Sequence, residues 1–307
     1  MFAVISPWVL TCVVLLGFGF GFAFPVLWLA IHEHREKRKR EQTEAPPQSE
    51  KLLRPPGYSL GKKLDSLEEN SLPKIVGAVV LGGVGGVFFG PALGLILSGQ
   101  SLLAALICLV VALPFFVAAA RFAQRLSRLI AEMRNYRLGM RGEQAVGESL
   151  NELGVQGYRA FHDLPAGETW NIDHVVVGPQ GVFVIETKAR RRRKIPGGQP
   201  AHKVRFDGET LFFPSGEDRE AVPQAARNAK WIEEYLSKKT AEPVTAEALV
   251  VLPGLFVETE KPNRGGVAVM NTKYLKSYFS GRPAKIQAQQ LRRIIEALDE
   301  KCRDLEF

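Results

Sequence analysis

Two acidic residues and one lysine lie close together near the middle of this 307-residue chain. Asp173 falls in the apolar run 171–177, and Glu186 and Lys188 fall in the next such run, 182–188. Carboxylates placed side by side repel one another unless a cation compensates their charge. Lys188 is one candidate for that cation. A divalent metal ion is the other, because oxygen-rich sites suit Mg²⁺.

The four residues between these runs, 178–181, have the sequence Gly-Pro-Gln-Gly and predict a tight turn, hence a β-hairpin. If Val177 pairs with Val182, counting outward places Asp173 opposite Glu186, about 5 Å away. Side chains alternate along a strand. One face therefore carries both acids, the lysine and four valines: Asp173, Val175, Val177, Val182, Val184, Glu186 and Lys188. Four valines indicate a buried face, which favours a site over the alternative of harmless charges on an exposed edge.

A third acid, Glu143, is expected on the inward face of a helix. It begins a predicted helix over 142–153, three residues before an apolar stripe formed by Val146, Leu150 and Leu153. Glu143 therefore lies on the inward side of this helix. The alternative is that Glu143 only interacts favourably with the helix dipole, as acids in a first turn do.

Three stretches, in order, resemble the motifs of the nuclease-related domain (NERD) family: Gly139–Glu143, Asn171–Lys188 and Val222–Gln224. The family is regarded as a branch of the PD-(D/E)xK nuclease superfamily. The resemblance implies an α/β fold of the restriction-endonuclease type, in which a mixed sheet is flanked by helices. It also implies a phosphodiester hydrolase.

The resemblance further implies a role for five residues. Asp173 and Glu186 would be metal ligands, and Glu143 would be an additional carboxylate of the metal site. Lys188 would position the attacking water or stabilise the developing charge, and Gln224 would be a supporting polar residue. The implied cofactor is Mg²⁺ or Mn²⁺, which polarises the phosphate and activates water.

A basic run follows the predicted active strand directly: Arg190, Arg191, Arg192, Arg193 and Lys194. Such a run is able to follow a nucleic-acid backbone through phosphate contacts. A solvated loop and a patch facing lipid head groups are alternatives of equal weight. The formal net charge of the chain, +8, fits either polyanion, nucleic acid or anionic membrane lipid.

The C-terminal part, residues 139–307, has the mixed pattern of an α/β domain. Around the hairpin, the periodicity predicts a strand over 158–164, a helix over 223–237, strands over 248–252 and 266–270, and helices through residue 304.

The N-terminal part is far more apolar, and three of its runs reach the length of about 20 residues that crosses a bilayer. They are residues 1–31, 75–97 and 101–120. A cleaved signal peptide is the alternative for the first run, but no basic residue precedes it and the strongest charge cluster follows it. Residues 75–120 are expected to form a transmembrane hairpin, with Pro114 bending its second helix.

Lys and Arg are concentrated after the first and third runs, at 35–40 and 121–141. The positive-inside rule therefore predicts an integral membrane protein with its N-terminus outside and its C-terminal domain cytoplasmic. Residues 32–74 are expected to be a basic, proline-containing linker, and residues 121–138 an amphipathic basic stalk. The three cysteines form no CxxC pair or ligand cluster, which is typical of a reducing compartment.

Glycines recur at every fourth residue of the second run: Gly82, Gly86, Gly90 and Gly94. Small residues at this spacing let another helix approach closely. That helix belongs either to the third run of the same chain or to a second copy, which would make a homo-oligomer.

These patterns predict a membrane-anchored, metal-dependent nuclease that hydrolyses nucleic acid, DNA rather than RNA, at the cytoplasmic membrane face. The alternative is a catalytically silent module that binds nucleic acid or assembles at the membrane.

Overall fold

A computed structural model of the chain describes residues 51–99, 101–168, 170–191, 193–194, 200–260 and 266–305, with residues 28, 29, 31, 32, 35, 36 and 39. The predicted first span, 1–31, lies almost wholly outside the described residues. Described residues beyond 50 divide into two compact units. One is formed by residues 65–134, and the other by residues 51–64 together with 135–305.

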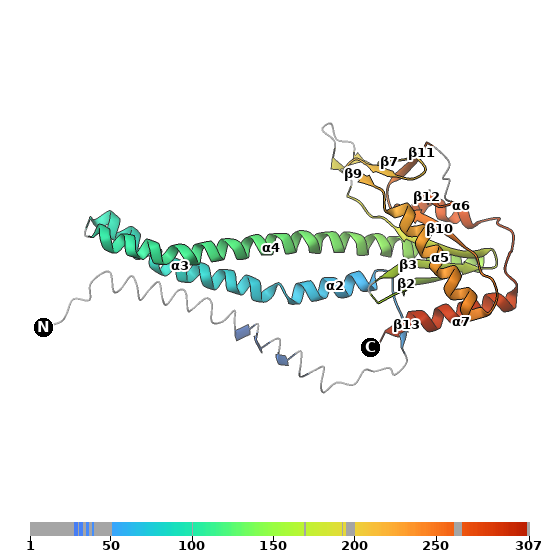
Figure 1. Ribbon diagram of the computed structural model, residues 1–307, viewed down its shortest axis with the longest axis horizontal. Coiled ribbons are helices and arrows are strands. Elements are labelled where there is room, and N and C mark those ends of the chain that lie inside the picture. The colour runs from blue at the N-terminus through green and yellow to red at the C-terminus, as the bar shows by residue number, and fades with distance from the viewer. Residues whose placement is uncertain are drawn as a thin grey trace. The chain divides into compact units, whose positions relative to one another are not determined.

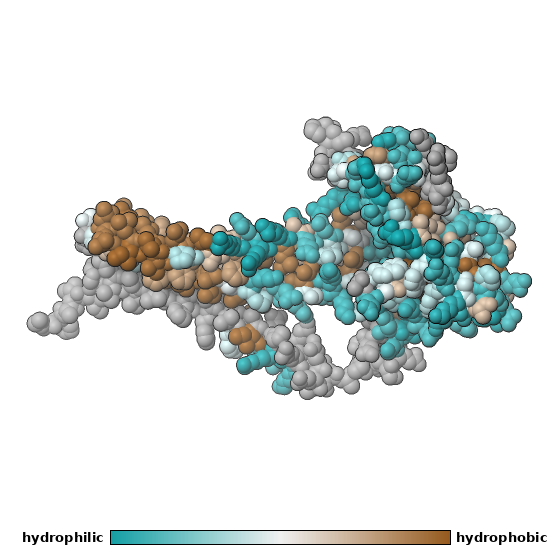
Figure 2. Space-filling view, in the orientation of Figure 1, coloured by the Kyte–Doolittle hydropathy of each residue, from teal (hydrophilic) through white to brown (hydrophobic). Residues whose placement is uncertain are grey.

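The first unit contains α3 (Leu72–Ser98) and the N-terminal part of α4 (Leu102–Asn151). Hydrophobic residues gather over the part of these helices that lies furthest from the second unit along the chain (Figure 2). Among the described residues, two helices are long and apolar enough to cross a membrane, judged by length and composition. α4 continues through Pro114 and includes residues 121–151, where a separate stalk and a separate helix are expected. Residues 121–138 contain no glycine or proline to end the helix.

The small residues of α3 face α4 at some positions and open space at others. A Cβ atom added to Gly85 would lie 3.2 Å from Phe115 Cβ, and one added to Gly82 would lie 4.0 Å from Ala119 Cβ. Gly86 has no such neighbour within 4 Å. Close packing within the chain therefore uses Gly85, which lies outside the predicted glycine row. Self-association through that row stays a prediction.

Two secondary-structure elements lie within residues 32–74, where a solvated linker is expected. They are β1 (Leu52–Leu53) and α2 (Tyr58–Glu69). Leu60, Leu64 and Leu67 recur at the spacing of one helix face, which accounts for α2. β1 pairs antiparallel with β13 (Arg303–Leu305). The described part of this interval is therefore folded.

A five-stranded mixed sheet is the centre of the second unit, in the order β12-β10-β4-β3-β2 (Figure 1). β2, β3 and β4 pair antiparallel, whereas β4, β10 and β12 run parallel. Val177 pairs with Val182, so the predicted hairpin register is confirmed. The strands are β2 (Arg159–Pro165), β3 (Asn171–Gly178), β4 (Gly181–Thr187), β10 (Ala246–Val251) and β12 (Ala268–Met270).

Helices cover both faces of this sheet. α5 (Ala221–Thr240) and α7 (Ala288–Cys302) share one hydrophobic cluster with the hairpin valines, Val175, Val177, Val182 and Val184, so the predicted valine face is buried. The C-terminal part of α4 and α6 (Leu275–Phe279) pack on the other face, against Val176, Phe183 and Ile185. Two short 3₁₀ helices, η1 (Glu152–Gln156) and η2 (Thr272–Tyr274), follow α4 and precede α6. This arrangement of a mixed sheet between helices confirms the mixed α/β class.

A second, four-stranded sheet has the order β11-β7-β8-β9. Its inner side chains, Val204, Phe206, Leu211 and Phe213, belong to the same core as the hairpin valines. β9 ends three residues before α5, so this sheet fixes where α5 begins. Its strands are β7 (Lys203–Phe206), β8 (Leu211–Phe213), β9 (Gly216–Asp218) and β11 (Phe256–Thr259), and a separate pair joins β5 (Arg193–Lys194) to β6 (Pro200–Ala201).

Two buried histidines connect α4 to the hairpin. His162 Nε2 lies 3.1 Å from the amide oxygen of Asn151, which only accepts, so Nε2 carries the proton. His162 Nδ1 then accepts from His174 Nδ1–H, 2.9 Å away. His174 Nε2 accepts from the Thr187 hydroxyl, 3.2 Å away. Both rings are therefore neutral, and each ring nitrogen makes a hydrogen bond. The histidines thus hold Thr187, which lies between Glu186 and Lys188.

Burial keeps these rings neutral over a wide pH range. It lowers the pKa of His162 from the usual 6.5 to about 4, and burial together with the His162 charge holds the pKa of His174 well below its usual value. The unfolded chain therefore binds protons below about pH 6.5 while the folded chain does not.

We predict that the lowered pKa of His162 destabilises the second unit as the pH falls from 6.5 towards 4. The shift of His162 alone corresponds to about 3 kcal/mol across that window. Buried acids with a raised pKa, such as Glu143, act in the opposite direction, so the effect is read as the difference between wild type and His162→Gln. In thermal unfolding of the full chain, followed by tryptophan fluorescence, the Tm of His162→Gln should fall less, or rise more, on acidification than that of wild type, whereas His202→Asn should follow wild type. An equal pH dependence in wild type and His162→Gln would contradict the assignment.

Candidate active site

Asp173 and Glu186 lie at the end of the hairpin furthest from its turn. The ladder pairs His174 with Ile185, and one more step in this register places Asp173 opposite Glu186. Asp173 Oδ2 accepts from the Thr187 amide at 2.7 Å. Glu186 is only 2% exposed, whereas Asp173 is half-buried. The two carboxylates thus share one end of the sheet, as the spacing predicts.

Lys188 links these acids to α5. Its Nζ donates to Glu186 Oε1 at 2.8 Å and to Gln224 Oε1 at 3.1 Å. Its backbone N–H donates to Val251 O at 3.0 Å, which extends the pairing of β4 with β10. Gln224 lies in the first turn of α5, so helix and strand meet at the ammonium group. The structure therefore brings together four of the predicted residues at this point: Asp173, Glu186, Lys188 and Gln224.

Asn228 joins this group, although it is absent from the sequence prediction. Its side-chain amide donates to Glu186 Oε2 at 3.2 Å, and the residue is 3% exposed. Both oxygens of Glu186 are thus bonded, one to Lys188 and one to Asn228. The sequence carries a signal for this residue, because Asn228 follows Gln224 by four positions and so lies on the same helix face.

Glu143 reaches the same region from α4. The helix approaches the strand end closely here, since a Cβ atom on Gly142 would lie 2.5 Å from Ala189 Cβ. Only glycine allows this approach. Glu143 is 6% exposed, and its Oε2 is buried without a hydrogen-bond partner in the described chain. A buried carboxylate oxygen without a partner is costly unless a ligand satisfies it.

Burial and neighbouring charges raise the proton affinity of all three acids. Burial, then the charges of Asp163 and Glu186, raise the pKa of Glu143 to about 8. Burial, then the charges of Glu186 and Glu143, raise the pKa of Asp173 well above its usual value. Burial also raises the pKa of Glu186, against the opposing effect of Lys188. Such a cluster of acids favours a compensating cation.

Lys188 stays a cation in this setting. Burial alone would lower its pKa, but the charge of Glu186 and the hydrogen bond to it raise the pKa above the usual value. An ammonium with a raised pKa is a poor general base. Its chemistry is to donate hydrogen bonds and to stabilise negative charge.

Carboxylate oxygens of this kind are ligands for hard divalent cations. Among the residues that the structure describes, no three His, Cys, Asp or Glu side chains form a ready metal-binding group. Mg²⁺ keeps several waters and needs only one or two carboxylates together with substrate phosphate. Asp173, Glu186 and the unpartnered Oε2 of Glu143 supply oxygens of this kind.

The basic run after Lys188 is only partly described. Arg190 pairs with Asp218 at 2.9 Å, and its guanidinium lies 5.4 Å from the Phe213 ring centroid. Arg191 is exposed, Arg192 lies outside the described residues, and Arg193 and Lys194 form β5. Arg190 is therefore bonded to the protein itself.

Asp218 is a further residue that the sequence prediction misses. Its Oδ1 accepts from the amides of Glu220 and Ala221, at 3.1 and 3.0 Å, and so satisfies donors at the start of α5. Its Oδ2 accepts from Arg190. Because α5 carries Gln224 and Asn228, Asp218 fixes the helix that orients both. An acid just before a predicted helix is the signal that could have identified it.

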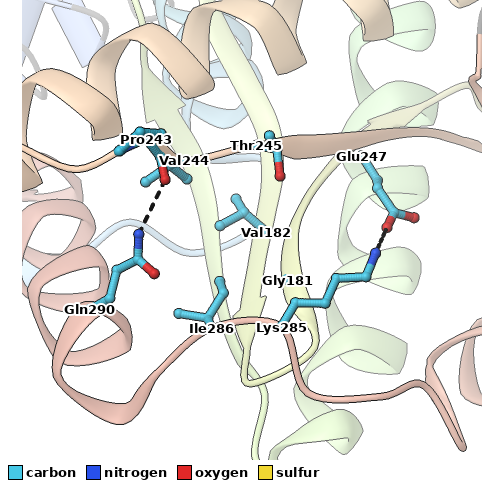
Figure 3. Close-up of a pocket in the computed structure, with 9 residues that line it drawn as sticks. All are labelled: Gly181, Val182, Pro243, Val244, Thr245, Glu247, Lys285, Ile286 and Gln290. Atoms are coloured by element: carbon cyan, nitrogen blue, oxygen red, sulfur yellow. Dashed lines mark hydrogen bonds and ion pairs between the residues drawn. The ribbon is translucent and has the colours of Figure 1, made fainter.

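A small pocket of about 100 Å³ lies at the turn end of the hairpin (Figure 3). Lys285 Nζ contacts Glu247 Oε1 at 3.1 Å, and Gln290 donates to the Pro243 carbonyl at 3.2 Å. These polar groups are thus already partnered. Val182, which lines the pocket, is four residues from Glu186, or about 13 Å along the strand. The pocket is separate from the carboxylate cluster.

Comparison with known proteins identifies the family of this part of the chain. Residues 138–253 match the family model of the nuclease-related domain. An uncharacterized protein of Bacillus anthracis is 39% identical over 54 residues, which cover 16% of this chain and 26% of that protein. This chain thus matches about a quarter of that relative's length. A search of the solved structures gives no significant match. The chain therefore carries a nuclease-related domain, NERD, at residues 138–253.

Proposed function

We propose that this protein is a membrane-anchored, metal-dependent nuclease that hydrolyses phosphodiester bonds of nucleic acid, DNA rather than RNA. We further propose that its domain has the restriction-endonuclease type of fold. One observation carries the proposal. The ammonium of Lys188 is held between Glu186 and Gln224 at a strand end that also presents Asp173 and Glu143. This places a fixed cation beside a cluster of acidic oxygens, as phosphodiester hydrolysis requires.

In this proposal each residue has one task. Asp173, Glu186 and Glu143 would hold a Mg²⁺ or Mn²⁺ ion, which when bound polarises a phosphate oxygen and acidifies a water molecule. Lys188 donates to the negative charge that develops on the phosphate as water attacks phosphorus and the P–O bond to the leaving oxygen breaks. Gln224 orients the ammonium of Lys188, and Asn228 orients the carboxylate of Glu186.

The alternative is a catalytically silent module that binds nucleic acid or assembles at the membrane. It is favoured by the ion pair between Lys188 and Glu186, because both groups already satisfy each other without a ligand. In an active site this pair must open or share its bonds when substrate binds. A folded wild-type chain that binds nucleic acid and cleaves none would establish the alternative.

The membrane anchor is part of the proposal because α3 and α4 expose large apolar side chains. Leu97, Leu102, Leu103 and Val110 are each at least 70% exposed. Exposed patches of this kind are normally covered by lipid or by another protein. We propose that both helices cross the bilayer, with the nuclease-related domain on the cytoplasmic side as the Lys and Arg distribution indicates.

We predict that Asp173→Asn and Glu186→Gln remove cleavage while leaving the fold intact, since both changes keep the side-chain shape and delete one charge. Lys188→Ala should lower kcat about 100-fold, as loss of a group that stabilises developing charge does. Asn228→Ala should lower activity about 10-fold, because it frees only one Glu186 oxygen. The assay uses the purified full chain in detergent on linear, nicked and single-stranded DNA and on RNA, with and without chelator.

Glu258→Gln is the matched control, because this exposed acid pairs only with Lys203 in the described chain and should keep full activity. Circular dichroism checks the fold of every variant. Cleavage that persists in Asp173→Asn, or that ignores chelator, would exclude the metal-dependent mechanism.

The membrane proposal predicts that the full chain stays with the membrane pellet during alkaline carbonate extraction. A reporter that matures only in an oxidising compartment should be inactive when fused after Phe307. Release by carbonate would refute the anchor, whereas an active reporter would invert the proposed orientation.

A further inference from the structure

The segment at Leu53–Gly61 precedes the apolar helices in sequence, yet it folds with the nuclease-related domain. The chain leaves this compact unit after Leu64 and returns to it at Asn135. Arg54 N donates to Cys302 O at 3.2 Å, and the Arg54 guanidinium pairs with Asp304. This segment lies outside residues 138–253, which match the family.

Glycines let the segment lie directly on the part of α4 that carries Glu143. Gly57 has φ +77, and a Cβ atom there would lie 2.9 Å from Met140 Cγ. A Cβ atom on Gly147 would lie 2.8 Å from Pro56 Cβ, and one on Gly139 would lie 3.1 Å from Leu60 Cδ1. Side chains larger than hydrogen would force the segment away. The contacts lie on both sides of Glu143, about one helical turn away.

Asp163 fastens the same segment from the sheet side. This acid is fully buried and has φ 51, a backbone conformation that non-glycine residues rarely adopt. Its Oδ2 accepts from the amide and the hydroxyl of Ser59, at 3.0 and 2.6 Å, and lies 3.5 Å from Arg54. Asn171 donates to Oδ1. A buried charge with this many partners holds its neighbours in fixed positions.

The segment also reaches Glu143 itself. The Gly57 backbone lowers the pKa of the Glu143 carboxyl, against the larger effects of burial and neighbouring acids that raise it. Glu143 Oε2 remains buried without a partner in the described chain. Glu143 thus lies against this segment and still has one oxygen available for a ligand.

We propose that residues Arg54–Ser59 are a positioning element that orients Glu143 for metal binding, so that two stretches separated by the apolar helices build the site together. This inference rests on the proposed nuclease function. Partners that orient a ligand in this way commonly change metal affinity 10- to 100-fold when they are lost.

Gly147→Ala tests the proposal in the full chain in detergent. Alanine favours the helix intrinsically, but its Cβ would displace Pro56. We expect Mn²⁺ affinity, measured directly by electron paramagnetic resonance of the free ion, to fall about 10-fold. Amide exchange should speed up at residues 54–61. Gly154→Ala is the matched control, because no atom lies within 4 Å of a Cβ there, and it should change neither quantity.

A second variant, Arg54→Ala with Ser59→Ala, loosens the segment without a steric clash and guards against misfolding of Gly147→Ala. It should weaken Mn²⁺ binding in the same way, raise the Mn²⁺ requirement for cleavage and leave the KM for DNA at saturating metal unchanged. A purely structural segment would instead lower Tm without changing metal affinity.

The outcomes separate the two proposals. A wild type that neither binds Mn²⁺ nor cleaves overturns the proposed function and the positioning role with it. An active wild type whose variants lose protection at 54–61 but keep their Mn²⁺ affinity overturns the positioning role alone.

Discussion

Repulsion among three clustered carboxylates is the constraint on which the rest of this domain depends. Glu143, Asp173 and Glu186 come from α4, β3 and β4, and the charge of Glu186 raises the pKa of the other two. Burying like charges is unfavourable unless hydrogen bonds and cations offset the loss of water. The surrounding structure supplies them for two of the acids: the Thr187 amide for Asp173, and Lys188 and Asn228 for Glu186.

The two faces of the sheet place different polar groups near the carboxylates. On the α5 side, Gln224 and Asn228 extend one turn apart from a single helix and bond the ends of Lys188 and Glu186. On the α4 side, the polar groups behind the strand are two neutral histidines whose nitrogens bond Asn151, Thr187 and each other.

The hairpin and the positions of Asp173, Glu186 and Lys188 on it were predictable because the sequence signals are local. A turn of four residues and the period of two along each strand fix the register that brings Asp173 to Glu186. Helical period likewise places Glu143 inward, and motif resemblance points to Gln224. The residues that sequence reasoning missed depend on chain segments far apart. Asn228 matters only because α5 packs on β4, and Asp218 only because the small sheet sets the start of α5.

The interval before α3 is the clearest example of a non-local signal. Its two proline pairs and its charges are typical of a solvated linker. Its structure comes from partners contributed elsewhere: Asp163 in β2, glycines in α4 and β13 near the C-terminal end. The unusual φ of Asp163 has no signature in a single sequence. The contacts of these residues form only in the assembled fold.

The pairing of β1 with β13 also sets an order of events during synthesis. β1 leaves the ribosome early, before α3 and α4, whereas its partner strand at residues 303–305 is the last element to emerge of those that the structure describes. With the proposed membrane anchor, both apolar helices would reach the bilayer while the strand that pairs with β1 is still unmade. The segment that lies against Glu143 cannot reach its final contacts until translation of this region is complete. Under that proposal, membrane insertion would precede completion of the carboxylate cluster.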